Sequence, residues 1–273
     1  ETMVRLADWA SDEILDNVLG ITIASEGQIT ARSSDRLSGD LRSRALAAID
    51  GDPSTHWSPE FLEQEGQWIS YTLPANIKVD KLELQIMADT RHSIPTELIL
   101  IVDEEEVYLN VPEIGQRSEI GYSQTVSIDL PYVLEGKEIT LIVSKVEEVK
   151  TNNWYTGQDI VTPIALVELG IRELEAPPMP AILDSGCRDD LIQIDGNPIP
   201  IRIQGLTDDA LNGRGLIGSL CGESVGLSEG QHLVETTDGR FTGFNIDRVV
   251  MVSAKGGEAV ERWSETADPI EAK

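Results

Sequence analysis

The sequence has few basic residues and no long apolar run. Its 21 lysines and arginines face 48 aspartates and glutamates, which gives a net charge of −27. A chain this acidic repels phosphate backbones and anionic lipid headgroups, so we expect no binding to nucleic acid or to a membrane surface. No stretch approaches the roughly 18–20 apolar residues of a membrane helix. The N-terminus also lacks the layout of a signal peptide.

Signatures of common catalytic sites are missing as well. The 3 histidines stand in unrelated contexts, and there is no G-x-S-x-G, H-E-x-x-H or phosphate-binding loop motif. So many carboxylates guarantee acidic pairs by chance, but a glycosidase needs two at about 5–9.5 Å, which sequence does not place. We therefore expect this chain to be non-catalytic.

Cysteine is scarce, and both residues lie in the C-terminal part, at Cys187 and Cys221. Neither belongs to a C-x-x-C pair or to a histidine cluster of the kind that holds zinc. Two interpretations remain open from the residues alone. The cysteines form a disulfide within one small domain, or they are two reduced, buried thiols.

What the sequence does contain is short strands separated by turns. At 273 residues, 40% hydrophobic and 25% charged, the chain has a globular composition and is long enough for two domains. Apolar and polar residues alternate in segments bounded by Gly, Pro, Asn and Asp, with no βαβ rhythm. This pattern predicts an all-β fold of two antiparallel β-sandwiches in tandem. The clearest first-sandwich strands are expected at 68–73, 81–86, 97–102, 124–130 and 138–143.

The order of these patterns predicts the domain organisation. A short helix is expected near residues 10–19, because its apolar side chains share one face after a possible Ser11 cap. Three prolines between 177 and 180 mark a linker, since neither a helix interior nor a central strand tolerates them. The expected parts are an N-terminal segment 1–27, a sandwich 28–175, a linker 176–181, a smaller sandwich 182–254 and an acidic tail 255–273.

The most informative stretch runs from residue 45 to 58 and contains Asp-Gly-Asp-Pro. Asp50 and Asp52 lie in a tight turn and Thr55 adds a hydroxyl, so several oxygens can converge on a hard cation such as calcium. Calcium takes about six to eight oxygens, so a remote partner is required, and Glu168 is well placed if the last strand returns beside the turn. The alternative is a plain Asp-Gly turn followed by a buried tryptophan.

The run Ala-Ile-Asp-Gly-Asp-Pro-Ser-Thr-His-Trp at 48–57 resembles the signature of discoidin (coagulation factor 5/8 type C) domains and related bacterial sugar-binding modules. Segments 28–34, 68–73 and 165–171 resemble that family's first strand, the strand after the loop and the closing strand. The resemblance implies a jelly-roll sandwich over 28–175 with a structural calcium. Its ligands would be oxygens of Ala47 or Ala48, and of Asp50, Asp52, Thr55 and Glu168.

The same resemblance suggests where a ligand binds. In the sugar-binding relatives, loops at one end of the sandwich present an aromatic face with Arg, His, Asn or Asp. Aromatic rings stack on the apolar face of a sugar while the polar groups bind its hydroxyls. The candidates are Arg91, His92, Asn152, Asn153, Trp154 and Tyr155. A Trp-Tyr pair at the edge of the core is the alternative, and His56 is expected to be a solvated loop residue.

Segments 184–203, 220–221 and 244–250 resemble the region behind the discoidin-like module of actinobacterial membrane α-(1→3)-arabinofuranosyltransferases. This implies an extracytoplasmic location, a Cys187–Cys221 disulfide, and membrane contact only through a catalytic domain outside the chain. The implied function is binding of a cell-wall glycan, arabinan or galactan. The alternative is a structural or protein-docking module that binds no sugar.

Overall fold

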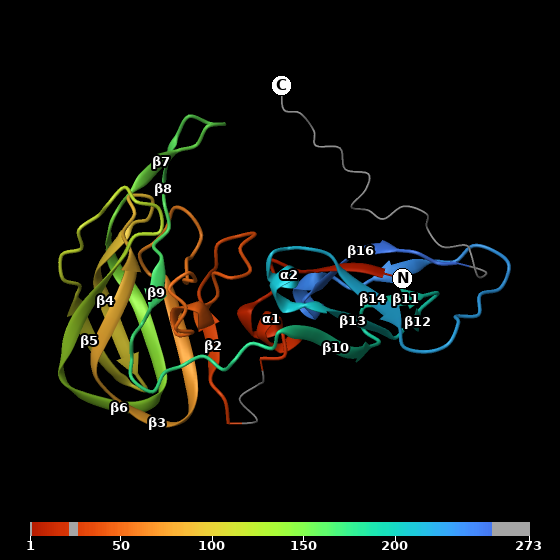
Figure 1. Cartoon of the computed structure of the whole chain (residues 1–273), viewed down its shortest axis with the longest axis horizontal. Coiled ribbons are helices and arrows are strands. Elements are labelled where there is room, and N and C mark those ends of the chain that lie inside the picture. The colour runs from red at the N-terminus through yellow and green to blue at the C-terminus, as the bar shows by residue number, and fades with distance from the viewer. Residues whose placement is uncertain (1, 22–26, 253–273) are drawn as a thin grey trace.

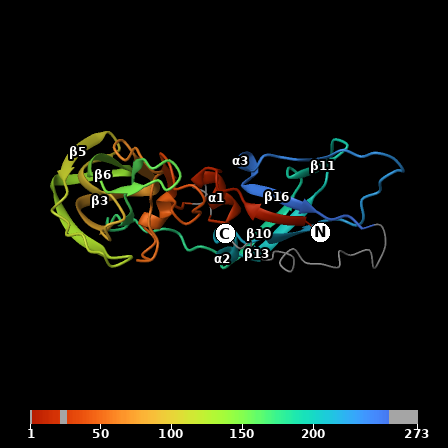
Figure 2. The same ribbon diagram turned by 90° about the horizontal axis from the view of Figure 1, so that it is seen from above.

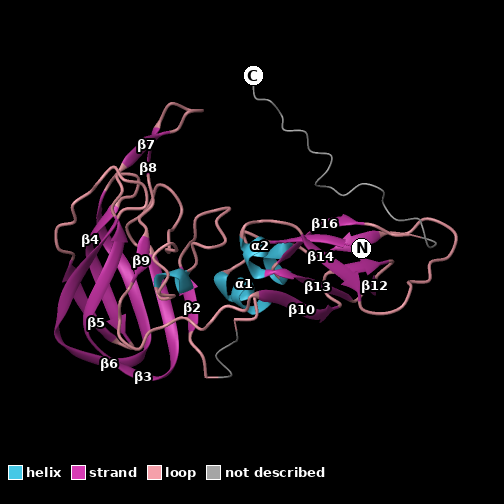
Figure 3. Cartoon of the chain, in the orientation of Figure 1, coloured by secondary structure: helices cyan, strands magenta, loops and turns pink. Residues whose placement is uncertain are grey.

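The structure is a computed structural model that describes residues 2–21 and 27–252. The predicted acidic tail, 255–273, lies outside the described residues. Two β modules lie side by side along the long axis of the molecule (Figure 1), and strands dominate both of them (Figure 3). The predicted all-β fold, built from antiparallel sheets, is confirmed.

The first module is an antiparallel sheet in the order β2-β3-β6-β4-β5, with β9 beside β3 and a separate β7–β8 hairpin. Its elements are β2 (Thr30–Ser33), the 3₁₀ turn η2 (Ala45–Ala48), β3 (Trp68–Met87), β4 (Ile94–Val102), β5 (Glu105–Asn110), β6 (Ser123–Glu147), β7 (Lys150–Asn152), β8 (Asp159–Val161) and β9 (Leu166–Glu168).

Two long strands, β3 and β6, turn this sheet into a sandwich because each contributes to both layers. The first part of β3 pairs with the last part of β6, and the residues after the bend pair with the beginning of β6. The register shifts at the bend, between Thr72 and Ile77 and again between Val79 and Lys81. The predicted strands 68–73 and 81–86 are therefore two halves of β3. The chain bends at the intervening Pro-Ala-Asn without reversing.

The second module contains a five-stranded sheet in the order β10-β13-β14-β1-β16 and a three-stranded sheet β12-β11-β15. Its elements are β1 (Thr2–Leu6), α1 (Asp12–Val18), β10 (Ile182–Arg188), β11 (Ile192–Ile194), β12 (Asn197–Pro198), β13 (Ile201–Leu206), α2 (Thr207–Leu211), β14 (Leu216–Leu220), β15 (Val234–Thr236), α3 (Gly239–Thr242) and β16 (Phe244–Val249).

Strand β1 makes the second module discontinuous in sequence. It lies between β14 and β16 and pairs antiparallel with both, so the N-terminal segment completes a sheet whose other strands follow residue 181. Thr2, Val4 and Leu6 are buried, in the alternation typical of a strand. The sequence pattern predicted only a helix in residues 1–27. A five-residue strand whose pairing strands are distant in the sequence gives too weak an alternation pattern to be predicted.

The predicted helix is present as α1. Ser11 is its N-cap and accepts a hydrogen bond from the Ile14 amide, as expected. Figure 2 shows α1 between the two modules. Its apolar residues Leu15 and Val18 join the core, while Asp12 and Asp16 are also buried. Buried carboxylates need ionic or hydrogen-bonding partners, and here the first module supplies them.

Asp12 joins the two modules through both of its oxygens. Oδ1 accepts from Arg36 at 2.7 Å, and the two side chains are only 5% and 8% exposed. Oδ2 accepts from the Ser33 hydroxyl at 3.0 Å and from the Ala45 amide at 3.1 Å. Arg36 also donates to the carbonyl of Ala10 at 3.1 Å. A buried ion pair and buried hydrogen bonds, in addition to the linker, therefore hold the two modules together.

A second buried ion pair lies beside the first. Arg44 and Asp16 approach to 3.3 Å, and both side chains are largely buried. Burial raises the pKa of Asp16 to about 6, and Arg44 opposes that rise.

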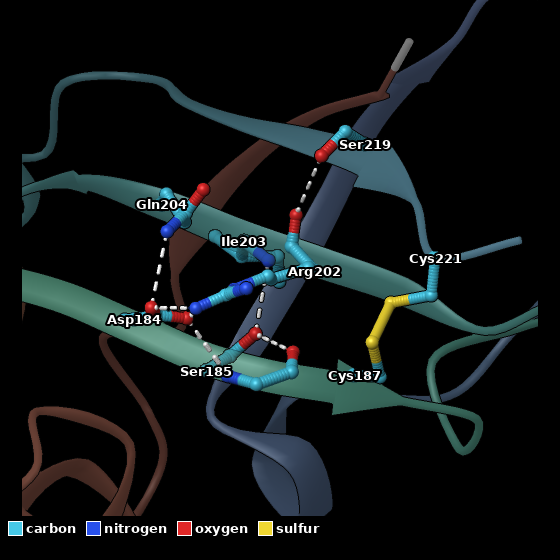
Figure 4. Close-up of a disulfide and its surroundings, with 9 residues drawn as sticks. Asp184, Ser185, Cys187, Arg202, Ile203, Gln204, Ser219 and Cys221 are labelled. Carbon is cyan, nitrogen blue, oxygen red and sulfur yellow. Dashed lines mark hydrogen bonds and ion pairs between the residues drawn. A yellow bond between two sulfur atoms is a disulfide. The ribbon is translucent and has the colours of Figure 1, made fainter.

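Cys187 and Cys221 are joined by a disulfide, with their Cα atoms 6.0 Å apart. Cys187 lies on the edge strand β10 and Cys221 directly follows β14 (Figure 4). The bond therefore ties β10 to β14 past the beginning of β13. Beside it, Arg202 donates from Nε to Asp184 at 2.7 Å. The edge strand is fixed at two points.

We expect the double variant Cys187→Ser/Cys221→Ser to unfold more easily. The bond closes a loop with a sequence separation of 34 residues. Loss of a cross-link of that length costs about 4 kcal/mol, because the unfolded chain regains conformational freedom. Urea titration followed by circular dichroism measures the change, and reduced wild-type protein should match the variant. Equal unfolding midpoints for oxidised wild type and the variant would contradict this role.

Candidate functional site

The loop before Trp57 and the last strand of the first module lie side by side. The Leu169 amide donates to the Ala48 carbonyl at 2.8 Å, and the Gly51 amide donates to Glu168 Oε1 at 2.6 Å. Strand β9 thus returns beside the Asp-Gly turn. This is the arrangement that the calcium hypothesis requires.

Within the loop, hydrogen bonds gather around Asp50. The Thr55 hydroxyl donates to its two carboxylate oxygens at 2.9 and 2.8 Å, and the Asp52 amide donates to Oδ1 at 2.9 Å. The Asp52 carboxylate accepts instead from the amide and the hydroxyl of Ser54, at 2.9 and 2.6 Å. The side chain of Asp52 is therefore engaged by Ser54. Its main-chain carbonyl accepts from Thr55 Oγ1 at 3.0 Å.

The carboxylates of Asp50 and Glu168 are hard to ionise together. Burial, followed by repulsion from Asp50 and Asp52, raises the pKa of Glu168 to about 7, although the Gly51 amide opposes the shift. Burial likewise raises the pKa of Asp50, against hydrogen bonds from Asp52 and Thr55. A bound cation would remove the repulsion and return both groups to their ionised form.

The donor set is compatible with a hard cation, but it is not rich in carboxylates. Within residues 2–21 and 27–252, no group of three or more His, Cys, Asp and Glu side chains is arranged to hold a metal ion. Ala47, Asp50, Asp52 and Thr55 line one hollow of about 290 Å³, which Arg42 and Arg44 also line and Glu168 does not. A calcium ion between the loop and β9, and not in this hollow, would take two carboxylates, Asp50 and Glu168, and otherwise hydroxyl and carbonyl oxygens, all of which suit calcium.

The β7–β8 hairpin forms an arm that projects from the sandwich (Figure 1). Trp154 and Tyr155 lie in the turn at its tip, with 90% and 83% of their side chains exposed. Their rings meet edge to face, with centroids 5.8 Å apart and an interplanar angle of 79°. The pair is therefore not an edge of the core. It is an aromatic surface presented to solvent.

The turn that carries these rings is braced by its own asparagines. Asn153 Oδ1 accepts from the amides of Tyr155 and Thr156, at 3.0 and 3.2 Å, and its carbonyl accepts from the Gly157 amide at 2.7 Å. Asn152 Nδ2 donates to the Gly157 carbonyl at 3.1 Å. Asn152 and Asn153 thus brace the turn that carries the aromatic pair, each through one atom of its side-chain amide.

Arg91 and His92 lie in a loop organised by the buried Asp89. Its carboxylate accepts from His92 Nδ1 at 2.7 Å, from the Arg91 amide at 3.1 Å and from the Gly121 amide at 3.2 Å. Burial raises the pKa of Asp89, but these hydrogen bonds outweigh it and the pKa is lowered. The side chain of Arg91 is exposed. The Arg91 guanidinium is therefore a charged hydrogen-bond donor on a loop whose conformation is held by Asp89.

His56 joins this group, although the sequence predicted a solvated residue. Its ring lies 5.9 Å from that of His92, edge to face. Its Nδ1 is buried without a hydrogen-bond partner among the described residues. Burial and the neighbouring His92 lower the pKa of His56, so the ring is neutral at pH 7. The sequence signal was its position beside Trp57, whose buried indole donates to the Asp35 carbonyl at 3.1 Å and anchors the loop.

The Arg91–His92 loop and the tip of the arm lie at the same end of the first module, but they do not form one continuous site. Ser93 Oγ accepts from the Val149 amide at 3.1 Å and donates to the Thr162 carbonyl at 2.6 Å, so the arm begins beside the Arg91 loop. The short strands β7 and β8 then carry the tip outward by about 10 Å, at roughly 3.3 Å per residue. The end of the module thus has a polar base and an aromatic tip.

No protein-family model matches the sequence, and no curated protein matches it significantly. Among solved structures, the chain is similar to the arabinofuranosyltransferase AftD from mycobacteria, with a TM-score of 0.63 and 16% sequence identity. The alignment covers 90% of this chain and 18% of AftD, so this chain spans less than a fifth of that enzyme. A variant of AftD gives a TM-score of 0.60, 17% identity and coverages of 90% and 19%.

A family 32 carbohydrate-binding module of C. perfringens NanJ, in complex with galactose, is also similar. The TM-score is 0.31 and the identity 16%, over 50% of this chain and 93% of that module. At such identities, similarity to AftD describes the fold alone, and the lower score of the NanJ module carries no argument. The predicted relationship to an arabinofuranosyltransferase is confirmed at the level of the fold, because the AftD similarity spans both β modules.

Proposed function

We propose that the first module binds a neutral glycan chain and that Trp154 and Tyr155 form its aromatic contact. The observation that carries this proposal is the exposure of both rings on a braced turn. An aromatic side chain buries about 150–250 Å² when it is covered. At about 25 cal/mol per Å², leaving one in water forgoes on the order of 4–6 kcal/mol. An arm that holds two such rings away from the core is suited to a ligand.

A sugar fits the chemistry of this end of the module. Its C–H faces stack on aromatic rings, and its hydroxyls accept and donate directional hydrogen bonds. Arg91 is exposed and supplies planar donors for such hydroxyls. Because base and tip are separated, the ligand is an oligosaccharide that spans them.

The overall charge restricts the class of glycan. With a net charge of −27, the protein repels polyanionic chains at a distance. Arabinan and galactan are neutral, and we propose chains of this kind as the ligand.

Protein docking is a second candidate, and one observation favours it. Phe61 and Leu62 are 40% and 56% exposed, and the Leu62 amide donates to the Val161 carbonyl on β8 at 3.0 Å. The exposed apolar residues of the loop at 61–62 therefore lie beside the base of the arm. Exposed apolar surface of this kind also suits a protein partner.

We further propose that the chain is a non-catalytic, extracytoplasmic part of a larger membrane-bound arabinofuranosyltransferase. The fold shared with AftD over 90% of this chain supports this assignment. The disulfide between Cys187 and Cys221 fits an oxidising compartment. No helix among the described residues is long and apolar enough to span a membrane. Contact with the membrane would then come from the rest of that protein.

We also propose a structural calcium ion at the Asp50 loop, held by Asp50, Glu168, Thr55 and the carbonyls of Ala47 and Asp52. Opposed carboxylates with raised pKa values support it. Such an ion would fix the loop against β9, close to Trp57 and His56.

A glycan-binding screen tests the main proposal. Immobilised arabinan and galactan oligosaccharides are probed with wild-type protein, with Trp154→Ala and with Tyr108→Ala. Tyr108 is a matched control, because it is 71% exposed but lies on β5, away from the arm. We expect wild type and Tyr108→Ala to retain the same neutral glycan and Trp154→Ala to lose it. Equal retention by all three proteins, or by none, would refute the assignment.

A further inference from the structure

The second module carries a groove that the proposed function does not use. Trp9, between β1 and α1, meets residues 236–240 and the first residues of β16 around a hollow of about 590 Å³. Its volume lies within the range of about 300–1,000 Å³ that is common for small-molecule sites. Two regions far apart in the sequence build it, Trp9 and residues 236–246. We call it the Trp9 groove.

An exposed aromatic ring forms one side of the groove. The Trp9 side chain is 57% exposed, so part of the indole is free to contact a ligand. Asp238 and Arg240 line the same hollow beside the ring. A half-exposed indole offers a flat apolar surface on which a sugar can stack.

Polar groups of both hydrogen-bonding types stand beside this ring. Asp238 accepts from Arg240 at 2.9 Å from the amide, 2.9 Å from Nη2 and 3.2 Å from Nε. These bonds, and a smaller one from Trp9, lower the pKa of Asp238 to about 2, so it is a permanent acceptor. The Thr236 and Asn245 side chains line the same hollow. An ionic pair, a hydroxyl and an amide together provide directional donors and acceptors.

The floor of the groove depends on a glycine. A Cβ atom at Gly239 would lie 2.2 Å from Asn245 Oδ1 and 2.7 Å from the Ala7 Cβ. Only a residue without a side chain lets the 238–240 turn approach β16 this closely. The groove is thus a defined local structure and not a gap between mobile loops.

We propose that the Trp9 groove is a second glycan site, which takes a neutral sugar through stacking on Trp9 and hydrogen bonds to Asp238, Arg240 and Asn245. An aromatic face with a carboxylate, a guanidinium and an amide at its border is chemically suited to sugar hydroxyls and C–H faces. Asp238 balances the charge of Arg240, which disfavours an anionic ligand. With the arm, the chain would then contact a long glycan at two places.

The test follows tryptophan indole N–H signals by nuclear magnetic resonance while neutral arabinofuranosyl and galactosyl oligosaccharides are added to the whole chain. Single Trp→Phe variants assign the signals. Trp57 is the internal reference, because it is fully buried and its indole donates to Asp35. We expect a saturable shift of the Trp9 signal with either sugar and no shift of Trp57.

Two arginine variants test whether the shift of the Trp9 signal arises from binding in the groove. Arg240→Ala removes a charged donor at the groove and should weaken the Trp9 response about tenfold, as loss of about 1.4 kcal/mol does. Arg214→Ala is the matched control. Arg214 is 67% exposed and pairs with Asp209, outside the groove lining, whereas Arg240 is 63% exposed. Equal responses in the two variants would contradict a role of Arg240 in binding.

The two glycan proposals fail separately in this experiment. A Trp154 shift without a Trp9 shift overturns the second site alone. A Trp9 shift without a Trp154 shift overturns the arm as a glycan contact and leaves the groove. If neither signal moves with either oligosaccharide, both proposals are wrong.

Discussion

Replacement of Asp12 by alanine should lower the free energy of unfolding by about 4 kcal/mol, because it leaves a buried charge without its partner. Arg36 is only 8% exposed and pairs with Asp12 at 2.7 Å. The Ser33 hydroxyl and the Ala45 amide would lose their acceptor at the same time. Each buried donor that is left unpaired adds to the cost. Urea unfolding measures the change.

The same helix supplies the control. Glu13 is next to Asp12 and pairs with Arg32 at 3.2 Å, but both side chains are 67% exposed. Exposed ion pairs contribute about 0–1 kcal/mol, so Glu13→Ala should have little effect. The double variant Asp12→Leu/Arg36→Met removes both charges and should recover part of the loss. If Asp12→Ala is no more harmful than Glu13→Ala, the buried pair does not hold the modules together.

Removal of calcium should lower the melting temperature of the wild-type protein by roughly 10 °C. A ligand at 1,000 times its dissociation constant stabilises the folded state by about 4 kcal/mol. For a protein of this size, each kcal/mol corresponds to about 2–4 °C. Calorimetry with and without a chelator gives the difference. Asp50→Ala should abolish it, whereas Asp129→Ala, an exposed carboxylate on β6, should preserve it.

The calcium effect should also grow with pH. Without metal, the pKa of Glu168 is raised to about 7, so protonation of Glu168 favours the folded state and this contribution is lost as the pH rises through 7. Calcium binds the ionised carboxylates and competes with the proton. Its stabilisation is therefore larger at pH 8 than at pH 5. A melting temperature that does not respond to chelation at pH 8, or a response that survives in Asp50→Ala, would refute the calcium site.

Sequence patterns predicted the parts of the fold that depend on local alternation. Segments 68–73 and 81–86 are strands, as expected, because apolar residues such as Leu82, Leu84 and Ile86 alternate toward the core. Their union into one bent strand was not predictable, since Pro-Ala-Asn is as typical of a turn as of a bend. Strand β1 was missed because its partners, β14 and β16, lie more than 200 residues away.

In the candidate sites, too, short sequence motifs were predictable, whereas contacts between residues far apart in the sequence were not. The Asp50 loop and the Trp154 pair were visible as short motifs. The local hydrogen bonds of Asn152 and Asn153 were not, because a polar residue in a turn is equally able to brace the turn or to bind a ligand. His56 acquired its environment from His92 across the module. The Trp9 groove combines Trp9 with residues more than 200 positions away, so no local pattern could reveal it.

Binding of a neutral glycan by the arm is the central claim, and calorimetric titration tests it most directly. Wild-type protein and Trp154→Ala are titrated side by side with the glycan retained in the screen. Loss of a central aromatic contact costs about 2 kcal/mol or more, which is roughly a thirtyfold loss of affinity. The prediction is saturable binding by the wild type and binding at least that much weaker by the variant. Identical isotherms for the two proteins would contradict it.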